Sequence, residues 1–382
     1  MQEIGIYIHI PFCKSKCFYC NFNSLDCLNK QNIDKKIDDY FNSLIKEIIS
    51  KAEILSTSIC KSIYIGGGTP SFVDSKYIKD VLSLLFNICN IKEDAEITIE
   101  INPGTLTLEK AKEYKESKIN RISLGMQSLN DDTLKKIGRM HNVQDFYDAI
   151  NILTTVGFTN ISCDYIFGLP NQSVDSVLKE FNELLKLPLK HISSYDLEVI
   201  EGTKLDFLIE NGYLTIPDDD TVVDIREAVQ KLLKEHMFIQ YEISNYAKEG
   251  YESRHNLNYW TQGEYIGLGL SASSYINQVR YTNISSLDDY ISNINTNKSI
   301  YNIDEEMDLL STMKEYVMLH LRLKEGVDRF LFKLKFKQEI ESIFKEELEK
   351  CITLKLLEKK NNKYMLTTKG KELANVVFRE FI

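Results

Sequence analysis

Hydrophobic and polar positions follow two alternating periodicities over the first half of the chain. Six short runs rich in β-branched and aromatic residues have the pattern of strands: 4–10, 62–65, 96–101, 121–124, 161–166 and 191–195. Between them lie stretches with apolar residues three and four positions apart, for example at 37–48, as in amphipathic helices. Six strand–helix units predict an α/β fold with a parallel sheet, either doubly wound or curled into part of a barrel.

Glycine and polar residues gather where these strands are expected to end. Glycines at 66–68 follow the second run, Glu100 and Gln127 come at the ends of the third and fourth, and Asp164 comes late in the fifth. In parallel βα architectures, the loops at the carboxyl ends of the strands build the site. We therefore expect these residues to face one cavity.

Three cysteines, Cys13, Cys17 and Cys20, follow the first run in a C-x-x-x-C-x-x-C spacing. Three thiolates this close together can hold three corners of a [4Fe–4S] cluster, which leaves one iron open to another ligand. The alternatives are a zinc site, which usually needs four protein ligands, and three unconnected thiols. The spacing favours the cluster and is the pattern of proteins that use S-adenosylmethionine (SAM) to chelate the unique iron.

Composition narrows the class of protein. The chain has 382 residues, enough for more than one domain, and its 43% apolar and 27% charged residues are ordinary for a globular protein. Eight cysteines without regular pairing favour a reducing compartment. We expect no signal peptide and no membrane-spanning segment. A net charge of −10 argues against nucleic acid as a partner.

The last quarter of the chain has a different pattern. A polar stretch at 293–302 predicts a linker between two domains, 1–292 and 303–382. Beyond it we expect a helix at about 304–323, strands at 354–357 and 364–367 and a final helix, which together suggest a winged-helix-like module. From Asp304 onward 16 Lys and Arg face 15 Asp and Glu. Without a basic surplus, we expect this module to pack against or cover the first domain.

A series of motifs runs in order from Tyr7 to Trp260: YIHIPFC, YIGGGTPS, EINPGT, RISLGMQS, IGRMH, DYIFGLPNQ, HISSYDLEVIEGT, YEISNYA and HNLNYW. Together they resemble the oxygen-independent coproporphyrinogen III oxidase family of radical SAM proteins. The resemblance implies a partial (β/α)6 barrel with a small C-terminal winged-helix-like α+β domain.

Three features make the chain resemble the HemW branch of this family, whose members are described as heme chaperones. Phe22 stands where the oxidase has a further cysteine, and only twelve residues precede Cys13, where the oxidase has a covering extension. The string at 255–260 resembles the H-N-x-x-Y-W motif of that branch. This branch binds heme, a [4Fe–4S] cluster and SAM, and passes heme to acceptor proteins.

Two enzyme classes remain as alternatives. One is the oxidase itself, which decarboxylates the propionates of coproporphyrinogen III in porphyrin biosynthesis by radical SAM chemistry. The other is a different radical SAM enzyme of the family, such as a methyltransferase or a heme-degrading enzyme. Position 22, the short N-terminus and the HNLNYW string favour the chaperone, so we expect the chain to lack oxidase activity.

Carried over residue by residue, the resemblance implies that Cys13, Cys17 and Cys20 hold the cluster. It assigns SAM contacts to eight residues: Tyr7, Gly67, Gly68, Thr69, Glu100, Gln127, Arg139 and Asp164. In the oxidase, five of these positions match contacts to a second SAM: Gly68, Thr69, Gln127, Arg139 and Asp164. Phe22 and the short N-terminus change that part of the site here.

His255 is the candidate heme ligand. A neutral imidazole is a common axial ligand of heme iron, and nearby Tyr259 and Trp260 could pack on a porphyrin face. The alternative is that this string only ties the end of the sheet to the next helix.

For the whole protein, the resemblance implies a cytoplasmic location, heme acceptors that include membrane-associated proteins at the inner membrane face, and compatibility with a homodimer.

Overall fold

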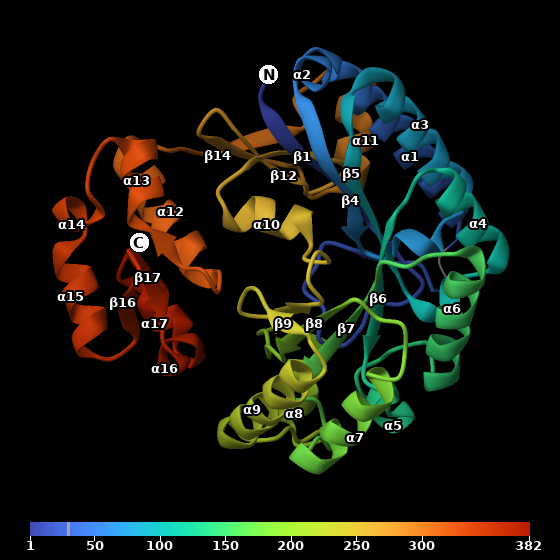
Figure 1. Ribbon diagram of the computed structural model, residues 1–382. Coiled ribbons are helices and arrows are strands. Elements are labelled where there is room, and N and C mark those ends of the chain that lie inside the picture. Colours follow the sequence, from blue (N-terminus) through green and yellow to red (C-terminus); the bar gives the residue numbers. More distant parts are fainter. Residues whose placement is uncertain (29–30) are drawn as a thin grey trace.

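The computed structural model describes residues 1–28 and 31–382, and most of its strands belong to one large sheet (Figure 1). Six parallel strands form its centre: β1 (Glu3–Ile10), β4 (Ile59–Gly67), β5 (Asn90–Ile101), β6 (Arg121–Gln127), β7 (Ile161–Phe167) and β8 (His191–Asp196). They lie side by side in chain order, each paired in parallel with the next. The predicted fold of six βα units around a parallel sheet is confirmed.

Shorter strands extend this sheet at both edges: β9 (Ile239–Gln240), β10 (Asn245–Ala247), β11 (Glu264–Leu268), β12 (Ser273–Ile276), β13 (Val279–Asn283) and β14 (Tyr301–Glu306). β11 runs parallel to β1 and begins an antiparallel extension through β12 and β13 to β14. At the other edge, β10 and β9 run antiparallel to β8. No pairing joins β14 to β9 in the described chain, so the sheet is an open, partial barrel.

Helices cover the outer face of the sheet, apart from α10 (Arg254–Trp260), which packs against β4 on the inner side (Figure 1). In chain order they are α1 (Ile33–Ser50), α2 (Ala52–Thr57), α3 (Ser75–Ile88), α4 (Leu108–Glu116), α5 (Asp131–Lys136), α6 (Val143–Val156), α7 (Val174–Leu184), α8 (Lys204–Glu210), α9 (Asp219–Glu235), α10 (Arg254–Trp260) and α11 (Leu287–Asn295). Short 3-10 turns, Pro70–Phe72 and Pro103–Thr105, follow β4 and β5. None of the helices in the described residues is long and apolar enough to cross a membrane.

Alternation along the strands decides which side chains meet the helices. On β1, Ile4, Ile6, Ile8 and Ile10 are fully buried and belong to the same apolar core as Leu44 of α1. Burial of such a side chain contributes roughly 1.5–3 kcal/mol, so this alternation sets the register of the strand. The residues between them face the barrel interior instead, where they are free to be polar.

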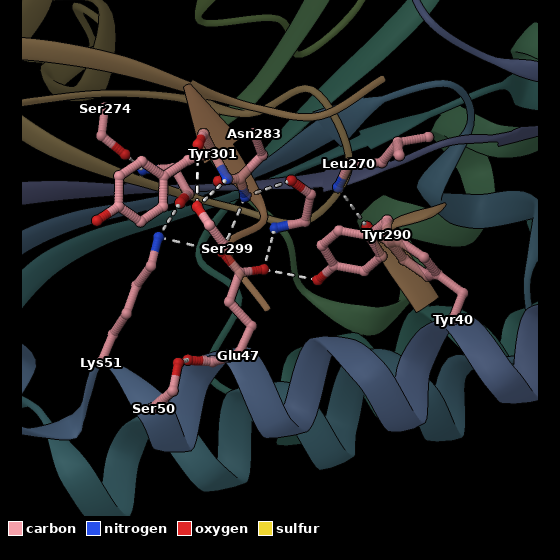
Figure 2. A network of polar contacts seen from close by, with 12 residues as sticks. Tyr40, Glu47, Ser50, Lys51, Leu270, Ser274, Asn283, Tyr290, Ser299 and Tyr301 are labelled. Carbon is pink, nitrogen blue, oxygen red and sulfur yellow. Dashed lines mark hydrogen bonds and ion pairs between the residues drawn. The ribbon is translucent and has the colours of Figure 1, made fainter. Parts of the chain in front are cut away.

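A buried carboxylate joins α1 to the antiparallel extension (Figure 2). Glu47 is completely buried, and its oxygens accept hydrogen bonds from the Asn283 side chain at 2.8 Å, the Tyr290 hydroxyl at 2.6 Å and the Gly269 amide at 2.8 Å. Lys51, one helical turn later, lies 3.1 Å from the same carboxylate. Because every oxygen has partners, this charge is tolerated in the interior and ties distant segments together.

The C-terminal part has an apolar core of its own, formed by residues between Met313 and Phe381. Its helices are α12 (Leu309–Arg322), α13 (Arg329–Phe336), α14 (Ile340–Ile343), α15 (Lys345–Thr353), α16 (Thr368–Glu372) and α17 (Ala374–Arg379). Its three strands, β15 (Val327–Asp328), β16 (Leu357–Lys360) and β17 (Lys363–Leu366), form a small antiparallel sheet in the order β15-β17-β16. The expected helices with a strand wing are present.

The structure corrects three expected boundaries in the C-terminal part of the chain and just before it. The stretch 293–302 is not a linker throughout, since it contains the end of α11 and the start of β14, which pairs with β13 and carries the main sheet to Glu306. The helix expected at 304–323 therefore begins only at Leu309. All six residues of β14 are exposed and most of them are polar, which is why the sequence predicted a linker and a helix start here. The first wing strand is also three residues later than expected, because α15 ends in a turn at Lys355, whose φ is 60°.

Candidate functional site

The interior face of the six central strands is polar. The register of the sheet places these side chains on one face: Tyr7, His9, Ser62, Tyr64, Thr98, Glu100, Arg121, Ser123, Asp164 and Ser193. The apolar residues at the alternate positions pack outward against the helices. The barrel interior is therefore built to receive polar groups at the carboxyl ends of its strands.

A cavity of about 780 Å³ opens at these strand ends. Its lining includes ten of the twelve residues predicted as site residues: Cys13, Cys17, Cys20, Gly67, Gly68, Thr69, Glu100, Gln127, Arg139 and Asp164. Tyr7 and His255 do not line it. Tyr7 stacks on Tyr64, with 6.3 Å between ring centroids, and its hydroxyl shares a hydrogen bond of 3.0 Å with the His9 ring.

The cysteine loop is closed by a short parallel pair, β2 (Phe12–Cys13) and β3 (Leu25–Asp26). Within it the amide of Cys20 donates to the carbonyl of Cys17 at 3.2 Å, and the amide of Cys27 donates to the carbonyl of Cys13 at 2.9 Å. Cys13 is buried, while Cys17 and Cys20 are half-buried. These bonds hold three thiols around one end of the cavity.

Two donors approach the sulfurs from outside the loop. The Arg139 guanidinium donates to Cys17 Sγ at 3.4 Å, and the Thr69 hydroxyl donates to Cys13 Sγ at 3.5 Å. Burial opposes the charge of Arg139, but neighbouring Cys17, Tyr19 and Cys13 outweigh it and raise the pKa of Arg139. Hydrogen bonds to cysteine sulfurs are a common feature of iron–sulfur sites, so this donor set fits a cluster held by three thiolates. In the described residues no three His, Cys, Asp or Glu side chains converge on a position for a single metal ion.

The glycine loop after β4 runs beside the cysteine loop. The amide of Gly68 donates to the carbonyl of Ile10 at 2.8 Å, and the amide of Thr69 donates to the carbonyl of Phe12 at 2.8 Å. Gly67 has a φ of 112°, and a Cβ on it would come within 2.6 Å of the His9 ring. Only glycine fits there, because both the backbone conformation and the close contact exclude a side chain.

Two half-buried carboxyl groups face the cavity from β5 and β7. Glu100 accepts a hydrogen bond from the Tyr64 hydroxyl at 2.8 Å and another from the Gly67 amide at 3.2 Å. Burial raises the pKa of Glu100 to about 7, against the opposing effect of these donors. Burial also raises the pKa of Asp164, which accepts from the Ser123 hydroxyl at 3.2 Å. The site therefore holds two carboxyl groups whose ionisation responds to a bound cation or hydrogen-bond donor.

Gln127 and Arg139 close the cavity above β6. Gln127 ends the strand with a positive φ of 70°, which turns the chain away. Arg139 donates through its second terminal nitrogen to the carbonyl of Gly125. The guanidinium thus links the end of β6 to the cysteine loop, where it faces both the thiols and any anionic group in the cavity.

His255 lies on the floor of the barrel rather than in the cavity. Its Nδ1 shares a hydrogen bond of 2.9 Å with the Ser62 hydroxyl, and its Nε2 shares one of 2.8 Å with the Tyr259 hydroxyl. Its ring stacks on Tyr64 at 5.2 Å, and burial lowers the pKa of His255 to about 3. In this conformation both ring nitrogens are occupied, so the heme-ligand role of His255 stays a prediction that requires the ring to break these bonds.

Sequence reasoning missed several residues of the cavity wall. Arg121 is the first residue of β6, lies deep in the barrel and lines the cavity. Burial opposes its positive charge, but Glu96 and other neighbours outweigh the effect of burial and raise the pKa of Arg121. The far wall comes from the C-terminal module, which contributes Arg322 and residues 371–376 and 378. The composition of that module predicted a covering role, but no motif marked which side chains reach the cavity.

Comparisons with known proteins agree with this architecture. The sequence model described as the radical SAM superfamily matches residues 7–184, and that of the HemN C-terminal domain matches residues 308–373. Among solved structures, coproporphyrinogen III oxidase (HemN) from Escherichia coli, a radical SAM enzyme, has a TM-score of 0.86 at 21% identity, covering 100% of this chain and 90% of that one. At this identity the likeness concerns the fold.

Sequence relatives extend over nearly the whole chain. The heme chaperone HemW of Lactococcus lactis subsp. lactis is 35% identical over 376 residues, which covers 98% of this chain and 96% of that protein. The protein of the same name from Bacillus subtilis is 34% identical over 377 residues and 98% of both chains. The one from Escherichia coli is 31% identical over 392 residues, with coverage of 100% and 99%.

Proposed function

The chain belongs to the HemW-type branch of the radical SAM superfamily, and we propose on this basis that it is a heme chaperone. In this proposal it binds heme together with a [4Fe–4S] cluster and SAM, and transfers the heme to acceptor proteins. The observation that carries the proposal is the cavity of about 780 Å³, which has three thiols at one end and aromatic and cationic side chains at the other. One space of this size offers room for a cofactor and for a larger planar ligand.

Cys13, Cys17 and Cys20 would hold the cluster, with Thr69 and Arg139 donating to its sulfur ligands. When bound, such a cluster supplies one iron that is open to an exogenous ligand. The chain's own residues give the loop its shape, keep the thiols at the cavity edge and place one permanent positive charge beside them.

SAM would lie above the strand ends, against the glycine loop. Gly67 and Gly68 line this part of the cavity, and Glu100 presents a carboxyl group to an ammonium or a ribose hydroxyl. Gln127 and Asp164 complete this side of the cavity. Tyr7 would act indirectly, by supporting Tyr64 and through it Glu100.

The oxidase alternative is disfavoured by position 22. Phe22 is 64% exposed and lines the cavity beside the cysteine loop. The oxidase has a further cysteine at this position. An exposed aromatic ring at the mouth offers an apolar contact to a planar ligand rather than a sulfur ligand. We propose that this chain does not decarboxylate coproporphyrinogen III.

The remaining parts of the proposal concern the setting of the protein. We propose a cytoplasmic protein that meets heme acceptors at the inner face of the membrane, has no nucleic-acid partner and is compatible with a homodimer. The expected domains, 1–292 and 303–382, with the main sheet continued through β14 to Glu306, would close over heme together, since both contribute to the cavity wall.

One experiment tests binding and turnover together. The anaerobically reconstituted protein is incubated separately with hemin and with coproporphyrinogen III, SAM and a reductant. We expect about one hemin bound for each chain, by Soret titration, and no protoporphyrinogen formed, by chromatography. Transfer of the bound hemin to apomyoglobin measures delivery. Formation of protoporphyrinogen with consumption of SAM would replace the chaperone proposal by the oxidase.

A further inference from the structure

The wall of the cavity that the C-terminal module forms contains an arginine, Arg322, with unused hydrogen-bonding capacity. Arg322 ends α12, and its guanidinium lies over the ring of Trp260, the last residue of α10, at 4.3 Å from the centroid. The two helices pack against each other, and α10 stands between α12 and the sheet (Figure 1). Both residues line the cavity, together with Phe378 of α17.

The hydrogen-bond donors of this pair are largely without acceptors. Among the described residues none accepts a hydrogen bond from Arg322, whose one ion pair is a long contact of 3.7 Å with the buried Glu242. The indole Nε1 of Trp260 is also buried and has no partner. Unsatisfied buried donors are unfavourable, and a guanidinium presents a planar fork that matches a carboxylate. Glu242, whose Oε2 also lacks a hydrogen-bond partner, is the one carboxylate that the described residues place beside Arg322, so the guanidinium retains donors for a second carboxylate in the cavity.

We infer that Arg322 and Trp260 form a seat for a carboxylate of a planar, apolar ligand, and that in this protein the ligand group is a propionate of the porphyrin. This inference rests on the proposed function and names the part of the cavity that recognises heme. The guanidinium lies over the indole and lines the cavity, where the Phe378 and Trp260 rings supply apolar surface for the macrocycle. The HNLNYW string then has two roles. Its first residue, His255, is hydrogen-bonded to Ser62 at the floor of the barrel, and its last residue, Trp260, forms part of the cavity wall.

The alternative is a purely structural role, in which Arg322 only holds α12 against α10. The two roles differ in which ligand they affect. A carboxylate seat discriminates hemin from its dimethyl ester, in which both propionates are neutral, whereas a purely structural arginine affects both ligands alike. Arg379, an exposed residue of α17 that does not line the cavity, provides a matched control.

The test measures dissociation constants by Soret titration in one detergent-containing buffer, with hemin and with hemin dimethyl ester. We expect the unaltered protein to bind hemin about tenfold more tightly than the ester. Arg322→Gln should weaken hemin binding about tenfold and change ester binding less than about twofold. Arg379→Gln should leave both constants unchanged.

Three results would overturn the inference: equal binding of hemin and ester by the unaltered protein, an unchanged hemin constant in Arg322→Gln, or equal losses for both ligands in that variant. The comparison of the two ligands in the unaltered protein does not depend on the folding of any variant. If the unaltered protein binds neither iron porphyrin, the proposed function itself fails, and this outcome is distinct from loss of discrimination.

Discussion

Replacing Glu100 by Gln should stabilise the protein in a pH-dependent way. Glu100 is a half-buried carboxyl whose pKa is raised from 4.5 to about 7, chiefly by burial. Between these two pH values the folded protein retains a proton that the unfolded chain has released, so the stability contributed by the neutral carboxyl is lost as the pH rises through 7. At about 1.4 kcal/mol for each pH unit, the difference corresponds to about 3 kcal/mol.

Glutamine reproduces the neutral form of this side chain. Its carbonyl oxygen can accept from the Gly67 amide, and its amide can donate to the Tyr64 hydroxyl, which is able to reverse its role. The variant should therefore keep both hydrogen bonds while avoiding the buried charge. At pH 5, where the Glu100 carboxyl is still mostly neutral in the folded protein, the variant and the unaltered protein should differ by only about 1 kcal/mol.

The assay is urea unfolding without SAM, followed by circular dichroism between pH 5 and pH 8.5. The advantage of Glu100→Gln over the unaltered protein should grow to about 3 kcal/mol at pH 8.5. Replacement of the exposed Glu116 by Gln serves as the control and should show no pH-dependent difference. A difference for Glu100→Gln that stays constant over this range, or greater stability of the unaltered protein at pH 8.5, would refute the assignment of a half-buried carboxyl with a raised pKa.

Four further outcomes are expected. Cys17→Ala should lose the brown chromophore and most of its iron, whereas Cys351→Ala should keep its iron content, as measured by absorbance and iron assay. SAM affinity by calorimetry should rise about tenfold from pH 6 to pH 8 if ionised Glu100 binds SAM, and this rise should vanish in Glu100→Gln. Glu47→Ala should cost about 3–5 kcal/mol of unfolding free energy, since it leaves buried partners unpaired; a loss below about 1 kcal/mol would contradict this. His255→Ala tests whether His255 is the axial ligand of heme iron. If it is, the Soret band of bound heme should shift in the variant. If the ring only makes its two hydrogen bonds within the protein, the band should stay unchanged and the free energy of unfolding should fall.

Local sequence patterns were sufficient for the central architecture. Alternating isoleucines on β1 and the helical stripe of α1 predicted the strand, the helix and the face on which they meet. Cysteine spacing identified the loop that lines the cavity edge, and the strand-end positions of Glu100 and Asp164 identified side chains that do face one space. These inferences succeed because periodicity and spacing within a few residues are dictated by the backbone geometry of strands and helices.

Other features depend on contacts between residues far apart in the chain. β14 pairs with β13 and extends the main sheet, whereas its exposed, mostly polar residues predicted a linker. His255 is hydrogen-bonded to Ser62 because α10 packs on β4, a contact that neither segment reveals alone, and its role as a heme ligand stays a prediction. Arg322 reaches the cavity only because α12 packs on α10, a contact that neither segment reveals alone. The sequence by itself determined the elements and the residue types at the strand ends; the tertiary structure decided which side chains share the cavity, because that depends on how distant segments pack.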